Sequence, residues 1–141
     1  MERHFARSFD SLDGVFAFIE EYLDAASADP SLSYPVSFAV EELFTNMVKY
    51  NADGPDRILI SIEPLEEGVK VSLVDYDSDP FDANDAPPAP VDAPLADRPV
   101  GGLGLHLIKH MVDSLHYEYA NRRSTVSFTR KVGSSDVRNK A

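Results

Sequence analysis

Two pairs of segments in which apolar and polar residues alternate constrain the fold of this chain most strongly. In the first pair, residues 57–63 and 69–74, every second side chain is aliphatic, and a Glu-Glu-Gly turn signal lies between the segments. The second pair, residues 114–120 and 124–132, is joined by an Asn-Arg-Arg turn. A period of two residues is that of a β-strand with one buried face. The pattern therefore predicts two β-hairpins.

Two longer segments instead repeat their apolar residues at the period of about 3.6 that is typical of amphipathic helices. The first begins after a capping residue, Ser11 or Asp13, and ends at the Asp-Pro-Ser sequence 29–31. The second tolerates Pro35 in its first turn and ends near the Asn-Ala-Asp-Gly-Pro sequence 51–55. We therefore predict two consecutive helices before the first hairpin.

A third predicted helix follows the glycines at 101–104, and a short alternating segment at 4–9 predicts an N-terminal strand. The order of elements is then β-α-α-β-β-loop-α-β-β. Because the helices are grouped apart from the hairpins, we predict an α+β fold. It would be a two-layer α/β sandwich, with a mixed, mostly antiparallel sheet and three helices on one face. With 43% hydrophobic content, residues 1–141 are expected to form a single domain.

Residues 75–99 follow neither period. They contain seven aspartates, six of the ten prolines and a single basic residue, Arg98. A loop of this length in a compact domain is usually functional or disordered, so an acidic linker and a flap over a ligand are both consistent with the composition. The polar residues 133–141 are expected to be a frayed tail.

Charge and composition restrict the classes of partner. A formal net charge of −11 disfavours binding to nucleic acid, which needs clustered Lys and Arg side chains. The chain has no cysteine, no signal-peptide pattern and no apolar run of membrane-spanning length. We therefore expect a soluble cytoplasmic protein that binds neither nucleic acid nor a membrane.

The second predicted helix carries a polar stripe. Glu42, Asn46 and Lys49 are spaced at i, i+4 and i+7, beside a broad apolar arc. A carboxylate, an amide oxygen and an ammonium are the groups needed to activate a hydroxyl, coordinate Mg²⁺ and hold a phosphate. An ordinary solvated helix face has the same pattern. This segment alone does not decide between the two interpretations.

Two other features bear on a ligand. Gly102 and Gly104 open the third predicted helix, where bare backbone N–H groups at the positive end of the helix dipole can bind phosphate. Neither a Walker motif nor a Rossmann fingerprint is present around them. Asp75 follows the second strand of the first hairpin and can accept a hydrogen bond from a base amine, although a turn aspartate is commoner there.

Together these segments resemble the GHKL family of ATP-binding domains, which includes histidine kinases, gyrase and bacterial anti-sigma serine kinases. Residues 42–50 are similar to its N box, Asp75 to its Asp-x-Gly motif, and Gly102-Leu103-Gly104-Leu105 to its Gly-x-Gly-Leu box. The segments 79–82 and 94–105 are most similar to the stand-alone anti-sigma factors of the RsbW type. The resemblance covers roughly residues 5–131.

The resemblance implies a role for each matching residue. Asn46 would coordinate the Mg²⁺ that bridges the ATP phosphates, and Lys49 would lie near these phosphates. Gly102 and Gly104, followed by Leu105, would let the backbone close over them. Glu42 would be the general base that takes the proton from a partner's serine. Residues 79–100 would form the ATP lid.

One position departs from the family pattern. Asp77 stands where the Asp-x-Gly motif has glycine. Its side chain would either crowd the adenine or, after a local shift in register, replace Asp75 as the adenine partner. Both alternatives remain at this stage.

The resemblance therefore implies two candidate functions. The first is an Mg·ATP-dependent serine/threonine-protein kinase that phosphorylates an anti-anti-sigma (STAS-type) antagonist and otherwise sequesters a sigma factor. The second is a regulatory binding module of the same fold with weak or no catalysis. Because no phosphoacceptor-histidine helix precedes the domain, a self-sufficient sensor histidine kinase is not expected. Family members often form homodimers, and the sequence does not say whether this chain does.

Overall fold

The computed structural model describes residues 1–77 and 102–132. The predicted ATP lid, residues 79–100, and the predicted frayed tail, residues 133–141, lie outside the described residues. Within the described part, helices and strands follow the predicted order along the chain.

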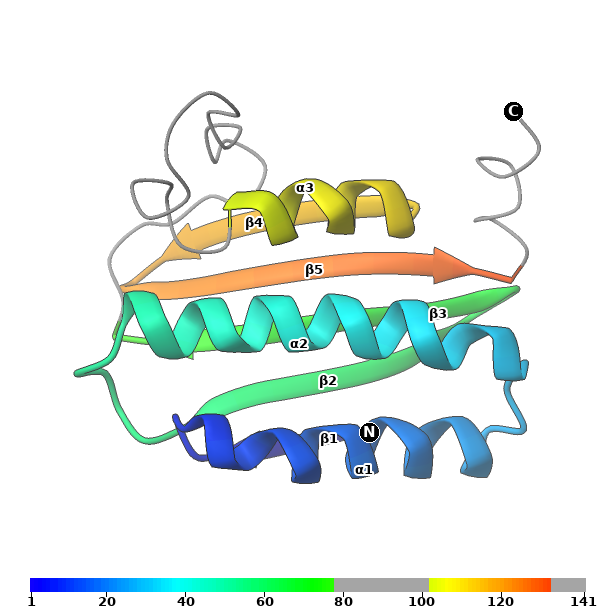
Figure 1. Cartoon of the computed structure of the whole chain (residues 1–141), viewed down its shortest axis with the longest axis horizontal. Helices are drawn as coiled ribbons and strands as arrows, with labels where there is room; N and C mark the ends of the chain where they lie inside the picture. Colours follow the sequence, from blue (N-terminus) through cyan, green and yellow to red (C-terminus); the bar gives the residue numbers. More distant parts are fainter. Residues whose placement is uncertain (78–101, 133–141) are drawn as a thin grey trace.

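Five strands form one sheet in the order β1-β2-β3-β5-β4 (Figure 1). All four pairings between neighbouring strands are antiparallel, so the described residues contain no parallel pair of the kind that a mixed sheet would include. Each hairpin forms with the predicted partners, and β1 extends the sheet beside β2. The strands span Glu2–Phe5 (β1), Ile58–Leu65 (β2), Gly68–Tyr76 (β3), Ser114–Ala120 (β4) and Arg123–Lys131 (β5).

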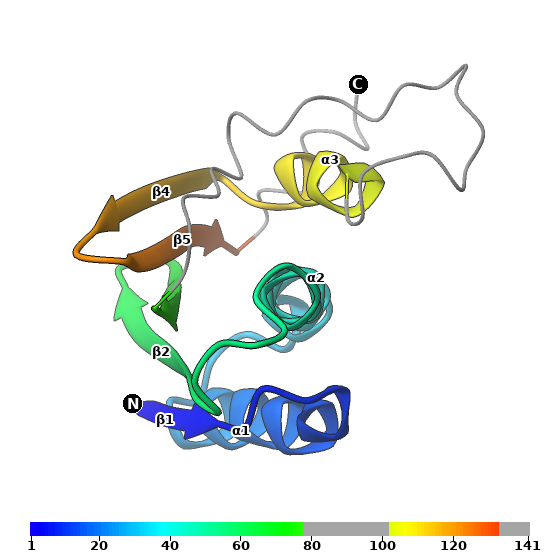
Figure 2. The ribbon, with the colours of Figure 1, turned by 90° about the vertical axis from the view of Figure 1, so that its left-hand side faces the viewer.

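Three helices cover one face of this sheet, as predicted (Figure 2). Helix α2 lies between α1 and α3, and its apolar arc faces the strands (Figures 1 and 2). None of the helices in the described ranges is long and apolar enough to cross a membrane. The helices span Leu12–Ala25 (α1), Ser33–Tyr50 (α2) and Gly102–Met111 (α3), and short 3₁₀ turns at Phe9–Ser11 and Pro30–Leu32 precede α1 and α2.

The N-terminal strand is shorter than the alternation at 4–9 predicted. It ends at Phe5, because the chain turns after Ala6 and the Ser8 hydroxyl accepts a hydrogen bond from the backbone N–H of Asp10. Ser11 stands at the N-cap position of α1, as predicted, but its hydroxyl donates to the carbonyl of Ala6 instead of capping the helix. Local side-chain hydrogen bonds of this kind compete with a regular strand.

The hydrophobic core lies between the helices and the sheet. Phe18 of α1, Phe44 of α2, Ile60 of β2, Leu73 of β3 and Phe128 of β5 are all fully buried there. In β3 and β5, buried residues alternate with half-exposed ones, so the second face of the sheet is left to solvent. Helix α2 contributes eight buried residues to this end-to-end contact with the sheet and its neighbouring helices.

At the start of β3, the paired strand leaves space only for glycine at position 68. A Cβ there would collide with the backbone carbonyl of Arg130 and lie 2.7 Å from the Cα of Lys131 in the paired strand. We expect Gly68→Ala to lower the free energy of unfolding by roughly 1–3 kcal/mol, because strand β5 would have to move. Chemical denaturation measures this change.

Gly14→Ala is the matched control. Gly14 lies inside α1, and the nearest atom to an added Cβ, Cε1 of Phe5, is 3.7 Å away, an ordinary contact. Alanine in a helix is favoured over glycine by about 1 kcal/mol, so this variant should gain stability. A Gly68→Ala variant as stable as wild type would show that β3 and β5 do not pair as closely as described.

Candidate functional site

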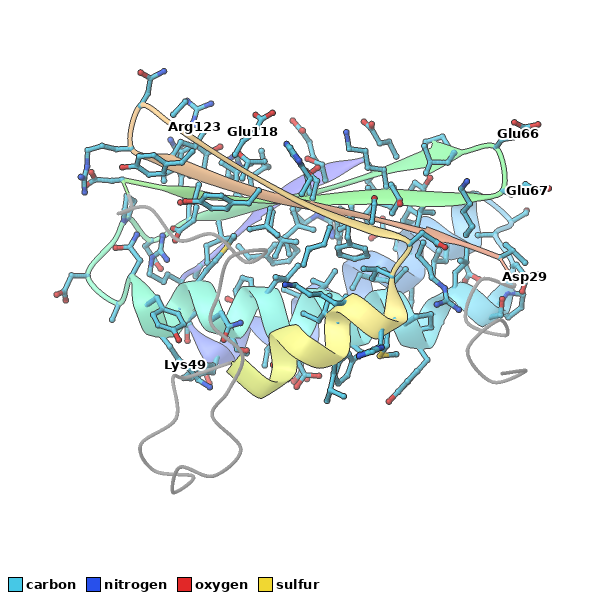
Figure 3. The ribbon with its side chains drawn as sticks, turned by 90° about the horizontal axis from the view of Figure 1, so that it is seen from above. Asp29, Lys49, Glu66, Glu67, Glu118 and Arg123 are labelled. Carbon is cyan, nitrogen blue, oxygen red and sulfur yellow. The ribbon has the colours of Figure 1, made fainter. Side chains whose placement is uncertain are left out.

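The C-terminal half of α2, the end of β3 and the start of α3 gather at one end of the molecule (Figures 1 and 3). This arrangement follows from the topology, because α2 and β3 run toward that end and α3 runs away from it. Lys49, in the last turn of α2, marks this end in Figure 3. The fold thus brings together the three chain segments that the sequence singled out.

Asn46 is the most unusual polar residue of the site. Its side chain is only 2% exposed, and neither its amide nitrogen nor its oxygen has a hydrogen-bond partner in the described part of the chain. A buried amide without a partner costs roughly 1–3 kcal/mol, and native proteins rarely retain one without a reason. The described residues therefore leave both the donor and the acceptor unsatisfied, and an amide oxygen is a normal ligand of Mg²⁺.

Glu42 lies one helical turn before Asn46 and is half-buried. Burial raises the pKa of its carboxyl group, the neighbouring Glu41 raises it further, and Lys49 opposes the shift. A carboxylate with a raised pKa is a stronger base than an exposed glutamate. The arrangement fits proton abstraction from a hydroxyl group.

Lys49 is exposed, and its ammonium lies 5.9 Å from the ring centroid of Phe9. The predicted polar stripe is therefore graded: Asn46 is buried, Glu42 half-buried and Lys49 exposed.

Asp75 is buried at the end of β3, with an ion-pair partner that the sequence analysis did not identify. The Arg7 guanidinium donates to Oδ1 of Asp75 at 2.5 Å, and Nδ2 of Asn51 donates to the same oxygen at 3.3 Å. The Arg7 and Asp75 side chains are 2% and 6% exposed. The predicted acceptor for a base amine is thus held by a buried cation.

Arg7 also contacts two other segments of the site, the end of α2 and the loop before β2. Its Nη1 donates to the carbonyl of Met47 at 3.1 Å, its Nε donates to the carbonyl of Pro55 at 2.9 Å, and its backbone N–H donates to Asp56. One side chain therefore fixes the end of α2 and the loop before β2 to the end of β3. The only signal in the sequence was a basic residue beside the N-terminal strand, which does not reveal its partner before the fold is known.

The backbone at Asp77 has a positive φ. Its φ is 50°, in the left-handed region that glycine adopts freely and that aspartate tolerates better than most residues. Its carboxylate accepts a hydrogen bond from Nε of Arg122 at 2.7 Å, in the turn between β4 and β5. Neither of the two alternatives predicted for Asp77 included this ion pair.

Helix α3 begins at Gly102, so Gly102, Gly104 and Leu105 all lie in its first turn. The first N–H groups of a helix have no partner within the helix and carry its partial positive charge. The anion-binding role of Gly102 and Gly104 needs such a helix start, and it stays a prediction.

The profile of the family described as "Histidine kinase-like ATPase domain" matches residues 5–130 of the chain. No curated protein sequence matches this chain significantly. Among solved structures, the RsbU and RsbW domains of Rv1364c from Mycobacterium tuberculosis are similar, with a TM-score of 0.64 and 15% identity. The match covers 93% of this chain and 31% of that one, so this chain spans less than a third of the larger protein.

Two further structures share the fold. A chain of the SiaB-SiaC complex from Pseudomonas aeruginosa has a TM-score of 0.57 and 18% identity, over 94% of this chain and 89% of that one. The histidine kinase AdeS of Acinetobacter baumannii has a TM-score of 0.52 and 16% identity, over 94% and 68%. At these identities the likeness concerns the fold alone.

Proposed function

The chain belongs to the family of histidine kinase-like ATPase domains, and from that premise we propose that it is an Mg·ATP-dependent serine/threonine-protein kinase. Its substrate would be an anti-anti-sigma antagonist of the STAS type, and it would otherwise sequester a sigma factor. The likeness in fold to an RsbW domain and to a chain of the SiaB-SiaC complex supports this choice of partner class. We place its action in the cytoplasm.

One observation carries the proposal: the buried amide of Asn46, one turn after the half-buried Glu42 on the same helix, has no hydrogen-bond partner in the part of the chain that the structure describes. When bound, Mg·ATP supplies the phosphoryl group and neutralises the charge that develops during its transfer. Asn46 would coordinate the metal ion through its amide oxygen. The backbone N–H groups of Gly102 and Gly104, with the Lys49 ammonium, would hold the phosphates.

Glu42 would act on the partner. Its carboxylate would accept the proton of the serine or threonine hydroxyl, so that the oxygen becomes nucleophilic when it faces the γ-phosphate. The raised pKa of Glu42 supports this role, because the proton is then transferred to a stronger base. Residues 79–100, as a lid, would close the site and exclude water.

Asn46→Leu tests the proposed metal site. Removing an unpartnered buried amide should raise the free energy of unfolding by about 1 kcal/mol. At the same time, Mg²⁺-dependent ATP binding should weaken at least about tenfold, the effect of losing roughly 1.4 kcal/mol of binding energy. Thermal unfolding and calorimetric titration with Mg·ATP measure the two changes.

Thr45→Val is the matched control, because Thr45 is half-buried on the same turn and its hydroxyl donates to the carbonyl of Glu42, its one hydrogen bond within the described residues. We expect wild-type affinity from it. An Asn46→Leu variant whose ATP binding keeps its full dependence on Mg²⁺ would refute the assignment of Asn46 as metal ligand.

The pH dependence of phosphotransfer tests the proposed base. The rate should fall as the pH decreases through the pKa of Glu42, because the protonated form accepts no proton. Glu41→Gln removes a negative neighbour that raises this pKa, so the fall of the rate on the acidic side of the pH–rate profile (its acidic limb) should move to lower pH. Lys49→Met removes the ammonium that lowers it, so the limb should move to higher pH. Rates across a pH series distinguish these opposite shifts, and shifts in the same direction would exclude Glu42 as the titrating group.

A regulatory module that binds its partner without catalysis is the second candidate. The engagement of Asp75 by Arg7 and of Asp77 by Arg122 favours it, because both carboxylates expected near the base are bound within the protein. Calorimetry with Mg·ATP at millimolar concentration separates the two candidates. A measurable heat of Mg·ATP binding supports the kinase function. The absence of such heat supports the regulatory module without catalysis.

A further inference from the structure

Two arginines and a tyrosine, Arg57, Arg123 and Tyr76, lie together on the face of the sheet that the helices leave uncovered, and we call this group the arginine clamp. Burial alternates along β3, with Asp75 buried toward the helices and Tyr76 directed to the opposite face. Tyr76 pairs directly with Arg123 of β5, and Arg57 immediately precedes Ile58, which pairs with Asp75. Arg57, Tyr76 and Arg123 therefore form a row that runs from the residue before β2, across β3, to the first residue of β5.

Both guanidinium groups of this row lie against one aromatic ring. Their central carbons are 4.1 Å (Arg57) and 5.4 Å (Arg123) from the ring centroid of Tyr76. Contacts of this length are cation–π interactions, and a guanidinium stacked on a ring keeps its N–H groups available at its edge. The ring thus restricts two flexible side chains before any ligand arrives.

Arg57 and Arg123 have no carboxylate as an ion-pair partner among the residues that the structure describes. Both side chains are exposed. Glu118, labelled beside Arg123 in Figure 3, has its carboxylate Oε1 3.5 Å from Nε2 of His116. On a chain with a net charge of −11, two arginines that stack on one ring and have no ion pair within the described ranges are a local exception.

We propose that Arg57, Tyr76 and Arg123 form a docking site for an acidic segment of a protein partner. Guanidinium groups bind carboxylates through paired, charge-assisted hydrogen bonds, which fixes both the sign and the geometry of the ligand. The repulsion from the rest of this acidic chain would exclude anionic proteins that do not present their carboxylates to this row.

The site is separate from the proposed nucleotide site. Figure 3 shows Arg123 and Lys49 at the same end of the molecule, with Arg123 on the strand side and Lys49 on the helix side. A partner held by the clamp would therefore leave the helix side accessible. The proposal does not depend on ATP binding, and Asn46→Leu should leave docking unchanged.

A fluorescein-labelled octaglutamate peptide, followed by fluorescence anisotropy at low salt, tests the site on the full chain. We expect Arg57→Gln/Arg123→Gln to bind at least about tenfold more weakly than wild type. Lys70→Gln/Lys109→Gln removes the same charge elsewhere and should bind within about twofold of wild type. Equal losses in the two double variants, or no binding by wild type, would overturn the proposal.

Two further measurements separate the clamp from a general anion site. Tyr76→Leu should weaken peptide binding, because the ring that orders the guanidinium groups is lost, whereas Tyr76→Phe should preserve it. Inorganic phosphate, compared with chloride at the same ionic strength, should not displace the peptide. Displacement by phosphate, or equal binding by the two Tyr76 variants, would contradict a docking site for an acidic protein segment.

Discussion

Glu42→Gln is expected to transfer phosphate to a protein partner at least about a hundredfold more slowly than wild type, while its affinity for Mg·ATP stays the same. General-base catalysis contributes about 10²–10⁴-fold to a rate, and glutamine cannot accept the proton. The shape of the side chain is kept, so neither the helix nor the neighbouring Asn46 should move. Phosphotransfer in single turnover and calorimetric titration with Mg·ATP measure the two quantities.

The stability of this variant provides an internal check. The pKa of Glu42 is higher in the folded protein than in the unfolded chain, so the folded protein binds this proton more tightly. The free energy of unfolding therefore falls as the pH rises from the pKa of Glu42 in the unfolded chain to its pKa in the folded protein. Above this interval the ionised carboxylate is a net cost to the fold. Glu42→Gln should therefore be at least as stable as wild type at neutral pH.

Glu41→Gln is the matched control for the rate. Glu41 is adjacent on the same helix and has the same charge, but it is not on the stripe with Asn46. Its substitution should leave transfer at neutral pH near the wild-type rate. A Glu42→Gln variant that transfers phosphate as fast as Glu41→Gln would remove Glu42 from the mechanism.

The layered fold could be predicted because its elements depend on local patterns. The alternation of Ile58, Ile60 and Ile62 directs one face of β2 into the core, and the same period holds in β3 and β5. The turns that end α2 and join the hairpins are also coded locally. These signals predicted the element order, the three helices on one face and both hairpin pairings.

The site could be predicted only in part. The spacing of Glu42 and Asn46 on one helix follows from the sequence, but the lack of a partner for Asn46 depends on packing against distant segments. The ion pairs of Asp75 and Asp77 join residues 68 and 45 positions apart. No local pattern records such pairs, because they form only when β1, β3 and the β4–β5 turn meet.

The conformation of Asp77 shows a similar limit. A glycine in the family pattern marks a need for positive φ, and Asp77 meets this need with φ of 50°. The structural constraint is therefore kept although the residue differs. Sequence comparison alone registers the difference and suggests a crowded pocket, whereas the side chain turns to Arg122.

Arg7→Met should be the most destabilising substitution in the site, lowering the free energy of unfolding by about 3–5 kcal/mol. The change leaves the Asp75 carboxylate buried without its cation, and it removes the donors to the carbonyls of Met47 and Pro55. Because Arg7 joins α2 to β3, nucleotide binding should weaken as well. Denaturant unfolding measures the stability change.

A double-mutant cycle with Asp75→Asn distinguishes a buried ion pair from general damage to the site. If the main cost is the uncompensated carboxylate, Asp75→Asn should recover a large part of the loss in the Arg7→Met background. Arg3→Met is the control, because the Arg3–Glu21 pair is 3.4 Å long, about half-exposed and expected to contribute less than about 1 kcal/mol. If Arg7→Met proves no more destabilising than Arg3→Met, Arg7 cannot be the residue that holds α2, β2 and β3 together around the site.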